Sequence, residues 1–358
     1  MTLEEQVLER IERVRRRGPR LIDSHITLPH GAGGKASRAL VEHVFLDAFG
    51  NPVLAELADA AAVTVDGTRL ALTTDSFVVS PLFFPGGDIG ELAVNGTVND
   101  LAVSGARPLY LSAGLILEEG FPIADVRRIA ASMASAAAQA GVQIVTGDTK
   151  VVQRGKADGC YINTTGVGWL DRPHRMDAAS VRPGDVVLVS GPIGDHGITI
   201  LLARGELDID ADLASDTAPL HAATAALLDS ASDQGVRVMR DATRGGVATV
   251  LNEIAEAAQV AVVVDEAAVP VRPAVTGACE LLGIDPLYVA CEGRFVAIVD
   301  PADVEAGLAA LRAAPGGEGA KVIGEVRADP PGLVLARTAF GGTRIVDTLV
   351  GDPLPRIC

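Results

Sequence analysis

The stretch Val63-Thr64-Val65-Asp66-Gly67-Thr68-Arg69-Leu70-Ala71-Leu72 shows how the chain begins to fold. Two runs of alternating apolar and polar residues, a pattern typical of β-strands, flank the dipeptide Asp66-Gly67. This dipeptide tolerates the positive φ angles of a tight turn. The segment therefore predicts an antiparallel β-hairpin.

Helical and strand-like patterns alternate along the chain on either side of this hairpin. Among them are helices expected at 89–104 and 123–140, the second ended by Gly141, and strands at 109–117, 142–145 and 161–170. After a connector at 173–183 the alternation resumes. The later elements are strands at 186–190, 236–239 and 260–264, a strand closed by Ile298, helices at 196–203, 217–233, 246–258 and 301–313, and two short strands near 321–336.

This alternation predicts an α/β protein with mixed sheets and two domains, at residues 25–178 and 179–338. A helical extension, with its helix at 3–17, is expected within residues 1–24. Residues 339–358 lack a strong period and are expected to form a tail that carries the terminal cysteine. The length of 358 residues agrees with two domains.

The charge balance narrows the possible partners. The chain has 30 Lys+Arg against 46 Asp+Glu, a net charge of −16, which disfavours broad binding to nucleic acids or anionic membranes. A nucleotide would have to be held locally, by backbone N–H groups, a metal ion and a few cations. Neither a membrane-spanning run nor a signal-peptide core is evident, so we expect a cytoplasmic protein.

The four cysteines are sparse, and they form no Cys-x-x-Cys pair that would indicate a zinc ribbon or a redox dithiol. One of them, Cys358, is the last residue, in the sequence Pro353-Leu354-Pro355-Arg356-Ile357-Cys358. An exposed terminal thiol suits nucleophilic or acceptor chemistry, while the alternative is that its position is accidental.

A glycine-rich loop runs from His30 into a helix expected from about Ser37. It contains Gly31, Gly33, Gly34 and Lys35. Backbone N–H groups in such a loop can approach a phosphate closely, and a lysine adds positive charge. A flexible surface loop is the alternative. Neither a P-loop nor a Rossmann glycine motif is present.

Three aspartates lie near strand ends or in a polar helix turn: Asp75, Asp100 and Asp148. Mg²⁺ prefers oxygen ligands and usually takes one or two protein carboxylates together with substrate phosphates. Each aspartate by itself could equally be a turn or cap residue. The three together with the glycine-rich loop indicate a metal–nucleotide site.

Two further segments carry candidate residues. The loop from Arg240 to Gly246 combines an acid with arginine and glycine before a helix, although Thr243 could simply cap that helix. Glu292 is expected within an apolar strand, where a carboxylate pKa often rises and suits a general base. A salt bridge with Arg294 or Arg272 is the alternative. His196 is a weaker candidate for a second loop at the site.

Several of these segments resemble motifs of the PurM-like ATP-binding superfamily. They are Thr74-Asp75-Ser76, Val98-Asn99-Asp100-Leu101-Ala102, Gly147-Asp148-Thr149 and the loop from Asp241 to Gly246. Within that superfamily the chain is similar to the HypE family of hydrogenase maturation proteins. This similarity rests on His30-Gly31-Ala32-Gly33-Gly34, Gly147-Asp148-Thr149-Lys150-Val151-Val152, Ala290-Cys291-Glu292-Gly293 and Pro355-Arg356-Ile357-Cys358. The chain departs from the superfamily pattern at Ala242, where proline is commoner.

The resemblance implies a homodimer in which the N-terminal sheets of two subunits pair, with ATP and Mg²⁺ held in a cleft. The metal ligands implied are Asp75, Asp100 and Asp148. The cofactor-binding residues implied are Gly31, Gly33, Gly34, Lys35, Asn99, Thr149, Asp241 and Arg244. The catalytic residues implied are Cys358, Glu292 as the base, and Lys150 for charge stabilisation.

The implied reaction starts when a HypF-type carbamoyltransferase places a carbamoyl group on Cys358. ATP-dependent dehydration then converts it to a thiocyanate, and the cyano group passes to iron on a HypC–HypD complex as a [NiFe]-hydrogenase ligand. We expect a mobile tail with at least two states. A different PurM-like kinase, of the selenide or thiamine-phosphate type, and a non-enzymatic dimeric scaffold are the alternatives.

Overall fold

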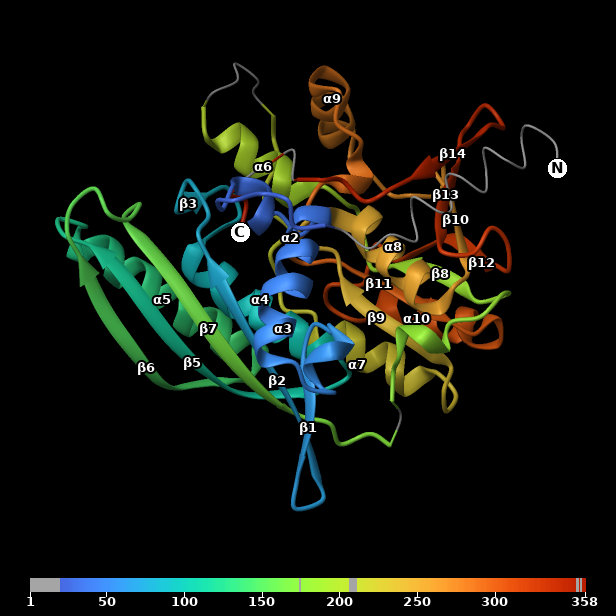
Figure 1. The fold of residues 1–358 in the computed structure, drawn as a ribbon, viewed down its shortest axis with the longest axis horizontal. Coiled ribbons are helices and arrows are strands. Elements are labelled where there is room, and N and C mark those ends of the chain that lie inside the picture. Colours follow the sequence, from blue (N-terminus) through green and yellow to red (C-terminus); the bar gives the residue numbers. More distant parts are fainter. Residues whose placement is uncertain (1–19, 174, 206–210, 352–353, 355) are drawn as a thin grey trace.

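The computed structural model describes residues 20–173, 175–205, 211–351, 354 and 356–358. The helix expected at 3–17 lies outside these residues, as do Pro353 and Pro355. The described residues form two large sheets, one from each half of the chain, and a separate two-stranded sheet of β3 (Phe83–Phe84) and β4 (Gly87–Asp88) (Figure 1).

The N-terminal sheet has five strands in the order β1-β2-β7-β5-β6. Its strands are β1 (Ala61–Val65), β2 (Thr68–Phe77), β5 (Arg107–Glu118), β6 (Gln143–Val152) and β7 (Cys160–Trp169). The expected hairpin is confirmed, because β1 and β2 pair antiparallel around Asp66 and Gly67, whose φ angles are +48° and +82°. Such angles suit glycine and the short polar aspartate.

Helices α4 (Ile89–Val103) and α5 (Ile123–Ala140) cover one face of this sheet (Figure 1). Both were expected from the sequence, and α5 ends at Gly141, whose φ is +69°. Helix α4 is buried almost all round, and polar residues such as Asn95 and Asn99 are buried along with the apolar ones. A helix of this kind belongs in the interior, and α4 indeed lies between its own sheet and the C-terminal half.

The C-terminal sheet has seven strands in the order β14-β13-β10-β12-β8-β11-β9. They are β8 (Val186–Val189), β9 (Val236–Asp241), β10 (Ala261–Asp265), β11 (Phe295–Val299), β12 (Lys321–Arg327), β13 (Leu333–Arg337) and β14 (Thr343–Val346). Only β10 and β13 pair parallel, so the sheet is mixed as expected. Helix α8 (Gly246–Ala258) covers one face, while α7 (His221–Ser230) and α10 (Val304–Ala313) cover the other.

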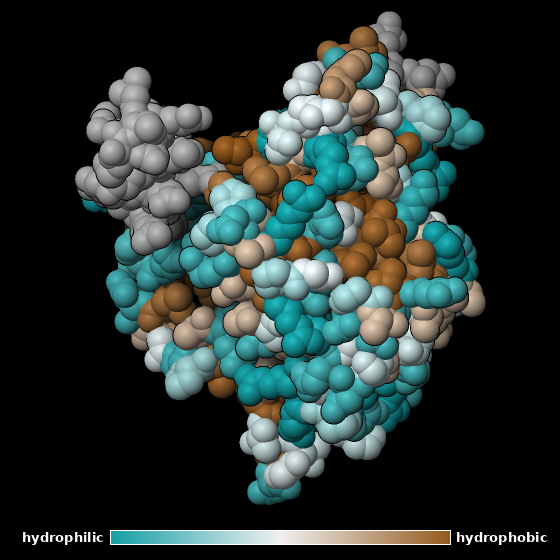
Figure 2. All heavy atoms as spheres, turned by 90° about the vertical axis from the view of Figure 1, so that its right-hand side faces the viewer, coloured by the Kyte–Doolittle hydropathy of each residue, from teal (hydrophilic) through white to brown (hydrophobic). Residues whose placement is uncertain are grey.

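The remaining elements are short or connect the two halves. They are 3₁₀ helices at Leu28–Gly31, Leu54–Glu56, Ala178–Ser180, Pro286–Tyr288 and Pro301–Asp303, a π-helix at Val41–Phe45, helices α2 (Lys35–Leu40), α3 (Leu46–Phe49), α6 (Asp195–Ala203) and α9 (Pro273–Leu282), and strands β3 (Phe83–Phe84) and β4 (Gly87–Asp88). No helix in the described ranges is long and apolar enough to cross a membrane. The face turned to the viewer in Figure 2 is largely hydrophilic in its lower half, and hydrophobic side chains gather in its upper half.

Two expectations need correction. The expected tail contains strand β14, which pairs antiparallel with β13, so residues 343–346 belong to the C-terminal sheet. The alternating pattern of four residues at a sheet edge is too short to detect by periodicity. Strand β6 is also longer than the expected 142–145 and includes Asp148 and Lys150. Its residues are almost all exposed, so it lacks the apolar signal of a strand.

The end of the chain packs against the junction of the two halves. Leu354 and Ile357 are each 2% exposed and join a core cluster that includes residues of α4, α5, α6 and α9. In this structure the described residues of the C-terminal segment are therefore docked, and movement of the tail stays a prediction.

Candidate functional site

Four carboxyl groups meet where the two halves of the chain join. They are Asp59 before β1, Asp75 on β2, Asp100 on α4 and Asp241 at the end of β9, and we call them the acidic cluster. Burial raises the pKa of Asp100 well above its usual range, and the charges of Asp75, Asp241 and Asp59 raise it further. Thr73 Oγ1 donates to Asp100 Oδ2 at 2.6 Å. The four carboxyl groups of the acidic cluster repel one another when ionised, so a positive charge is favoured there.

Arg244 links this cluster to the end of the chain. Its pKa is raised chiefly by negative charge on Cys358, and also, against the opposing effect of burial, by Asp75, Glu292 and Asp100. One guanidinium therefore interacts electrostatically with the terminal cysteine, the expected base and two of the expected metal ligands. It lies in the loop before α8, which ends in Gly245 at a φ of +75°. That glycine, and not Thr243, is the N-cap of α8, because the turn needs a left-handed residue.

Glu292 lies in a bend before β11 and not within a strand, which corrects the expectation. Its backbone N–H donates to Asp216 Oδ1 at 2.9 Å, and its carbonyl accepts from Asn99 Nδ2 at 3.1 Å. Its main chain is thus held by side chains and not by a neighbouring strand.

The Glu292 side chain is 3% exposed, and its Oε1 atom makes no hydrogen bond within the described residues. Burial raises the pKa of Glu292 well above its usual range, followed by the charges of Asp241, Asp216 and Asp75. The two arginines suggested as salt-bridge partners of Glu292 pair with other carboxylates. Arg294 pairs with Asp216 at 3.7 Å, and Arg272 pairs with Asp195 at 2.8 Å.

Asn99 joins α4 to the loops around this site. Its Nδ2 atom donates to the carbonyls of Glu292 and Ala218, both at 3.1 Å, and its Oδ1 accepts from the N–H of Leu220 at 2.8 Å. The side chain is 1% exposed. In this structure Asn99 therefore holds the backbone of Glu292 in place.

The glycine-rich loop is in contact with the C-terminal segment. The N–H groups of Lys35 and Ala36 donate to the carbonyls of Leu349 and Val350 at 3.0 and 3.4 Å. A Cβ atom on Gly34 would lie 2.4 Å from the Leu349 oxygen, so only glycine permits this approach.

The Lys35 side chain and two further glycines of the loop also have partners. Lys35 Nζ pairs with Asp347 at 2.9 Å, while Gly33 packs against Arg244. Gly31 lies at the end of the preceding 3₁₀ helix, with its carbonyl near the Arg244 guanidinium at 3.5 Å. The loop thus meets the site through Arg244, with the N–H groups of its first helical turn bonded to protein.

Asp148, Thr149 and Lys150 lie apart from the acidic cluster within one chain. The register pairs Asp75 with Thr164, Thr164 with Ala113, and Ala113 with Gly147. Three strand spacings thus separate β2 from β6, roughly 14 Å.

Asp148 also faces the other side of the sheet. Because it follows Gly147, its side chain points to the face opposite Asp75. It pairs with Lys150 at 2.6 Å, and the hydrogen bond from Lys150 lowers the pKa of Asp148.

The acidic cluster fits a divalent cation by its chemistry. Its donors are hard carboxylate oxygens, and a cation would relieve the repulsion that raises the pKa values of Asp100 and Asp241. Within the described parts of the chain, no group of three or more His, Cys, Asp or Glu side chains is arranged to hold a metal ion. Mg²⁺ needs only one or two carboxylates when phosphate oxygens and water complete its shell.

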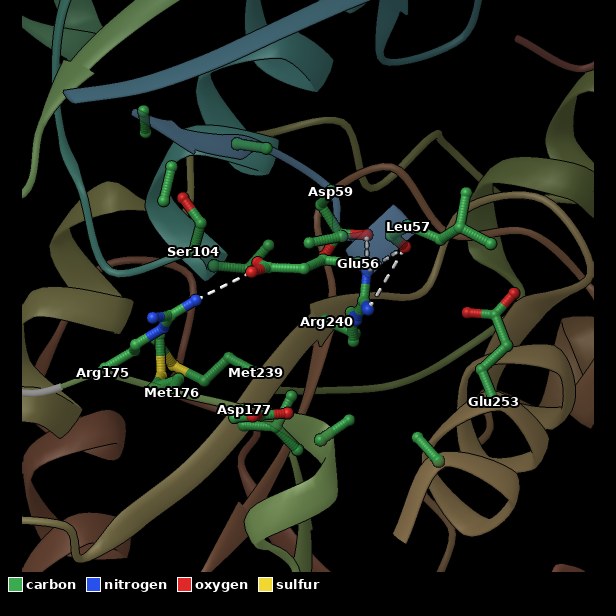
Figure 3. Close-up of a pocket in the computed structure, with 18 of the residues that line it drawn as sticks. Glu56, Leu57, Asp59, Ser104, Arg175, Met176, Asp177, Met239, Arg240 and Glu253 are labelled. Carbon is green, nitrogen blue, oxygen red and sulfur yellow. Dashed lines mark hydrogen bonds and ion pairs between the residues drawn. The ribbon is translucent and has the colours of Figure 1, made fainter. Parts of the chain in front are cut away.

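A cavity of about 660 Å³ opens beside the cluster, and Asp59 lies in its wall (Figure 3). Ion pairs cross it, with Arg240 to Asp59 at 2.6 Å and Arg175 to Glu56 at 2.8 Å. In Figure 3 the Glu253 carboxyl stands on a helix away from these pairs. Burial raises the pKa of Glu253 to about 7. The volume is in the range of small-molecule sites.

Comparison with known proteins identifies the relatives of this chain. Residues 57–170 match the AIR synthase related protein N-terminal domain, and residues 182–335 match its C-terminal domain. The protein named carbamoyl dehydratase HypE from Rhodobacter capsulatus is 55% identical over 340 residues, which cover 94% of this chain and 99% of that protein. The chain belongs to the HypE family.

Solved HypE structures share the fold. One, described as a HypE–HypF complex, matches with a TM-score of 0.82 and 47% identity, covering 87% of this chain and all of that chain. Another, described as HypE in complex with ATP, matches with a TM-score of 0.78 and 48% identity, covering 93% and 100%. The resemblance to the HypE family and the two-domain PurM-like fold are therefore confirmed.

The HypE site in this chain contains residues that the sequence analysis missed. Asp59 and Asp216 were not singled out, although Asp59 precedes a strand in Ala58-Asp59-Ala60 and could have been found in that way. Asp216 carried no such signal, because its role arises from contacts across the fold. Arg240 begins the candidate loop before α8, but the sequence analysis gave it no role of its own.

Proposed function

We propose that this chain performs carbamoyl dehydration with Cys358 as the carrier of the group and Glu292 as the base. The activity is the one for which its HypE relatives are named. The observation that carries the assignment is the position of Arg244, which interacts electrostatically with Cys358, Glu292, Asp75 and Asp100 at once. The carrier thiol, the base and the phosphate-binding region would then share one site.

The chemistry starts from a carbamoyl group bound to the Cys358 sulfur, S–C(=O)–NH₂. Its carbonyl oxygen attacks the γ-phosphorus of ATP, ADP leaves, and the nitrogen gives up one proton. Loss of the second N–H proton then breaks the C–O bond, releasing phosphate and leaving S–C≡N. Phosphate is a far better leaving group than hydroxide, so the two steps replace one difficult elimination.

Glu292 is suited to accept these protons. Its buried carboxyl has a raised pKa, so its carboxylate is a stronger base than an exposed one. Its Oε1 atom, which makes no hydrogen bond among the described residues, offers an acceptor position. Asn99 and Asp216 hold its backbone on both sides, which fixes the direction of approach.

The acidic cluster would hold Mg²⁺ through Asp75 and Asp100, with Asp241 and Asp59 as further oxygen donors. The metal, when bound, offsets the phosphate charge beside an acidic protein. Arg244 and the glycine-rich loop from Gly31 to Lys35 would then face the phosphates. In that case the N–H groups now bonded to Leu349 and Val350 would exchange partners when ATP enters.

A second copy of the chain would bring Asp148, Thr149 and Lys150 to this site. The open face of the N-terminal sheet exposes Leu72, Tyr110, Ile116 and Trp169, and apolar residues on an open sheet face favour burial against another sheet. We assign this face to a homodimer interface. Asp148 and Lys150 project from the same face, at its β6 edge.

The proposed partners follow from the carrier chemistry. A HypF-type carbamoyltransferase, as in the solved complex of a relative, would load Cys358. A HypC–HypD complex carrying iron would accept the cyano group, in the cytoplasm. A selenide- or thiamine-phosphate-type kinase would not need Cys358, and a scaffold would not consume ATP.

Intact-mass measurement after incubation with the carbamoyltransferase, carbamoyl phosphate and ATP tests the proposal. We expect wild-type protein to gain a carbamoyl group and then lose the mass of water. Glu292→Gln should accumulate the carbamoyl form with its dehydration slowed by at least about 100-fold, the usual contribution of a general base. Cys358→Ala should gain neither group.

Glu280→Gln, on the exposed side of α9, serves as the matched control and should behave as wild type. Normal thiocyanate formation by Glu292→Gln would refute the role of the base. A carbamoyl group found on Cys358→Ala would refute the role of the carrier.

A further inference from the structure

The docked end of the chain is held mainly by hydrogen bonds to its main-chain atoms. Val78 N–H donates to the main-chain oxygen of Cys358 at 3.0 Å, and Ser80 N–H donates to the Arg356 carbonyl at 3.2 Å. Arg204 links the same two segments. It donates from Nε to the Ser80 carbonyl at 3.0 Å and from Nη2 to the Arg356 carbonyl at 2.9 Å.

The carbonyl between these two, that of Ile357, is bonded by His196 Nε2 at 2.6 Å. His196 is 0% exposed and packs edge-on against Phe84 at 5.7 Å. Burial lowers the pKa of His196 to about 4, so the ring is neutral near pH 7. A carbonyl can only accept, so Nε2 must carry the proton.

The other ring nitrogen completes a chain of hydrogen bonds. With Nε2 protonated, Nδ1 is an acceptor, and Ser215 Oγ lies 2.7 Å from it. Ser215 Oγ in turn accepts from the N–H of Thr217 at 3.1 Å. The direction of every bond is therefore set, from Thr217 through Ser215 and His196 to Ile357.

The segment Ser215–Thr217 also holds the candidate base. Asp216, between Ser215 and Thr217, accepts from the Glu292 N–H at 2.9 Å. The position of the tail and the position of Glu292 thus depend on one short segment, Ser215–Thr217.

We propose that His196, oriented by Ser215, is a positioning residue that holds the C-terminal tripeptide in the site through the Ile357 carbonyl, with Arg204 acting on the Arg356 carbonyl. Loss of the imidazole donor leaves a buried carbonyl without its partner and favours the undocked tail. The inference deepens the proposed function, since it concerns where the carrier thiol is held. His196 and Arg204 contact main-chain carbonyls, so this docking does not depend on whether the Cys358 side chain is modified.

The rate of Cys358 labelling by a maleimide measures docking directly. Cys160, Cys279 and Cys291 are at most 2% exposed, so labelling of the native protein reports on Cys358, and Cys358→Ser gives the background. His196→Phe keeps an aromatic ring but removes the donor, and we expect labelling to become at least about tenfold faster.

His196→Gln places an amide N–H near the position of Nε2 and should restore protection to within about threefold of wild type. Ser215→Ala, a mild change, should speed labelling by a smaller factor. His43→Gln, on the exposed side of Val41–Phe45, is the matched control. Thermal unfolding of each variant confirms that it is folded.

Two results would overturn the proposal. Labelling of His196→Phe at the wild-type rate would show that the imidazole does not hold the tail. Equal acceleration in the Phe and Gln variants would show that ring packing, and not the N–H group, is responsible. The assay contains no ATP and no carbamoyl donor, so its outcome is separate from that of the dehydration test.

Discussion

At the scale of single residues, the site is dominated by carboxyl groups that repel one another. The pKa values of Asp100 and Asp241 are raised well above the usual range by burial and by their neighbours. Such groups destabilise the folded chain near neutral pH and persist where binding requires them. Neutralising one of them should therefore change stability and binding in opposite directions.

We predict that Asp100→Asn stabilises the fold and weakens Mg-ATP binding. Because its folded-state pKa lies above the unfolded value, Asp100 lowers stability as pH rises through that interval, and asparagine removes this loss. The unfolding free energy at pH 7.5 should increase by about 1 kcal/mol, and the gain should vanish below about pH 4. Mg-ATP affinity by calorimetry should fall at least about tenfold.

Asp75→Asn should weaken binding in the same way, and Asp66→Asn, in the exposed hairpin turn, is the control. Unchanged affinity in both site variants would remove the two aspartates from the metal site.

At the scale of elements, the last residues lie along the segment that follows β2. The segment Arg356–Cys358 pairs with Val78–Ser80, directly after β2, which carries Asp75. Arg356 also pairs with Asp158 in the β6–β7 connection and donates to the Val78 carbonyl at 3.3 Å. The docked register brings the terminal residue near Arg244.

Residues appended after Cys358 should therefore disturb docking of the tail more than they disturb ATP binding. We predict that a two-residue Gly-Ser extension leaves ATP affinity within about twofold but abolishes thiocyanate formation, followed by intact mass. The same dipeptide inserted between Asp66 and Gly67 should have no effect. An extended protein with full activity would show that the terminus does not need to fit the site.

At the scale of the whole molecule, one chain brings together only part of the expected site. Asp75, Asp100, Asp241, Glu292, Arg244 and Cys358 meet at the junction of the halves. Lys150 and Asp148 lie on the far edge strand, with exposed side chains. In the proposed homodimer, a second subunit would supply this edge.

Mixing two inactive variants tests the shared site. If Lys150 serves the partner's Cys358, then Lys150→Ala and Glu292→Gln homodimers are inactive, but each mixed dimer has one intact site. After subunit exchange, activity should return to about a quarter of wild type, because half of the dimers are mixed and each has one of its two sites intact. Absence of recovery, with exchange verified by mass, would place both residues in the same chain's site.

Short-range sequence patterns determined the local structure at several places and identified several of the candidate site residues. The hairpin at Asp66-Gly67 and the end of α5 at Gly141 depend on backbone conformations that particular residues favour, and both were predicted. The residue patterns also singled out Asp75, Asp100, Glu292 and Cys358, four residues that share one region of the structure, and the resemblance supplied their expected roles.

Only the tertiary structure decided which of these groups meet. It placed Glu292 in a bend held by Asn99 and Asp216, added Asp59 to the acidic cluster, and set Asp148 three strands away on the opposite face. It also gave His196 and Arg204 contacts with a segment about 150 residues later in the chain. Sheet register and the packing of the two halves determine such contacts. They depend on side chains far apart in sequence, which no local pattern records.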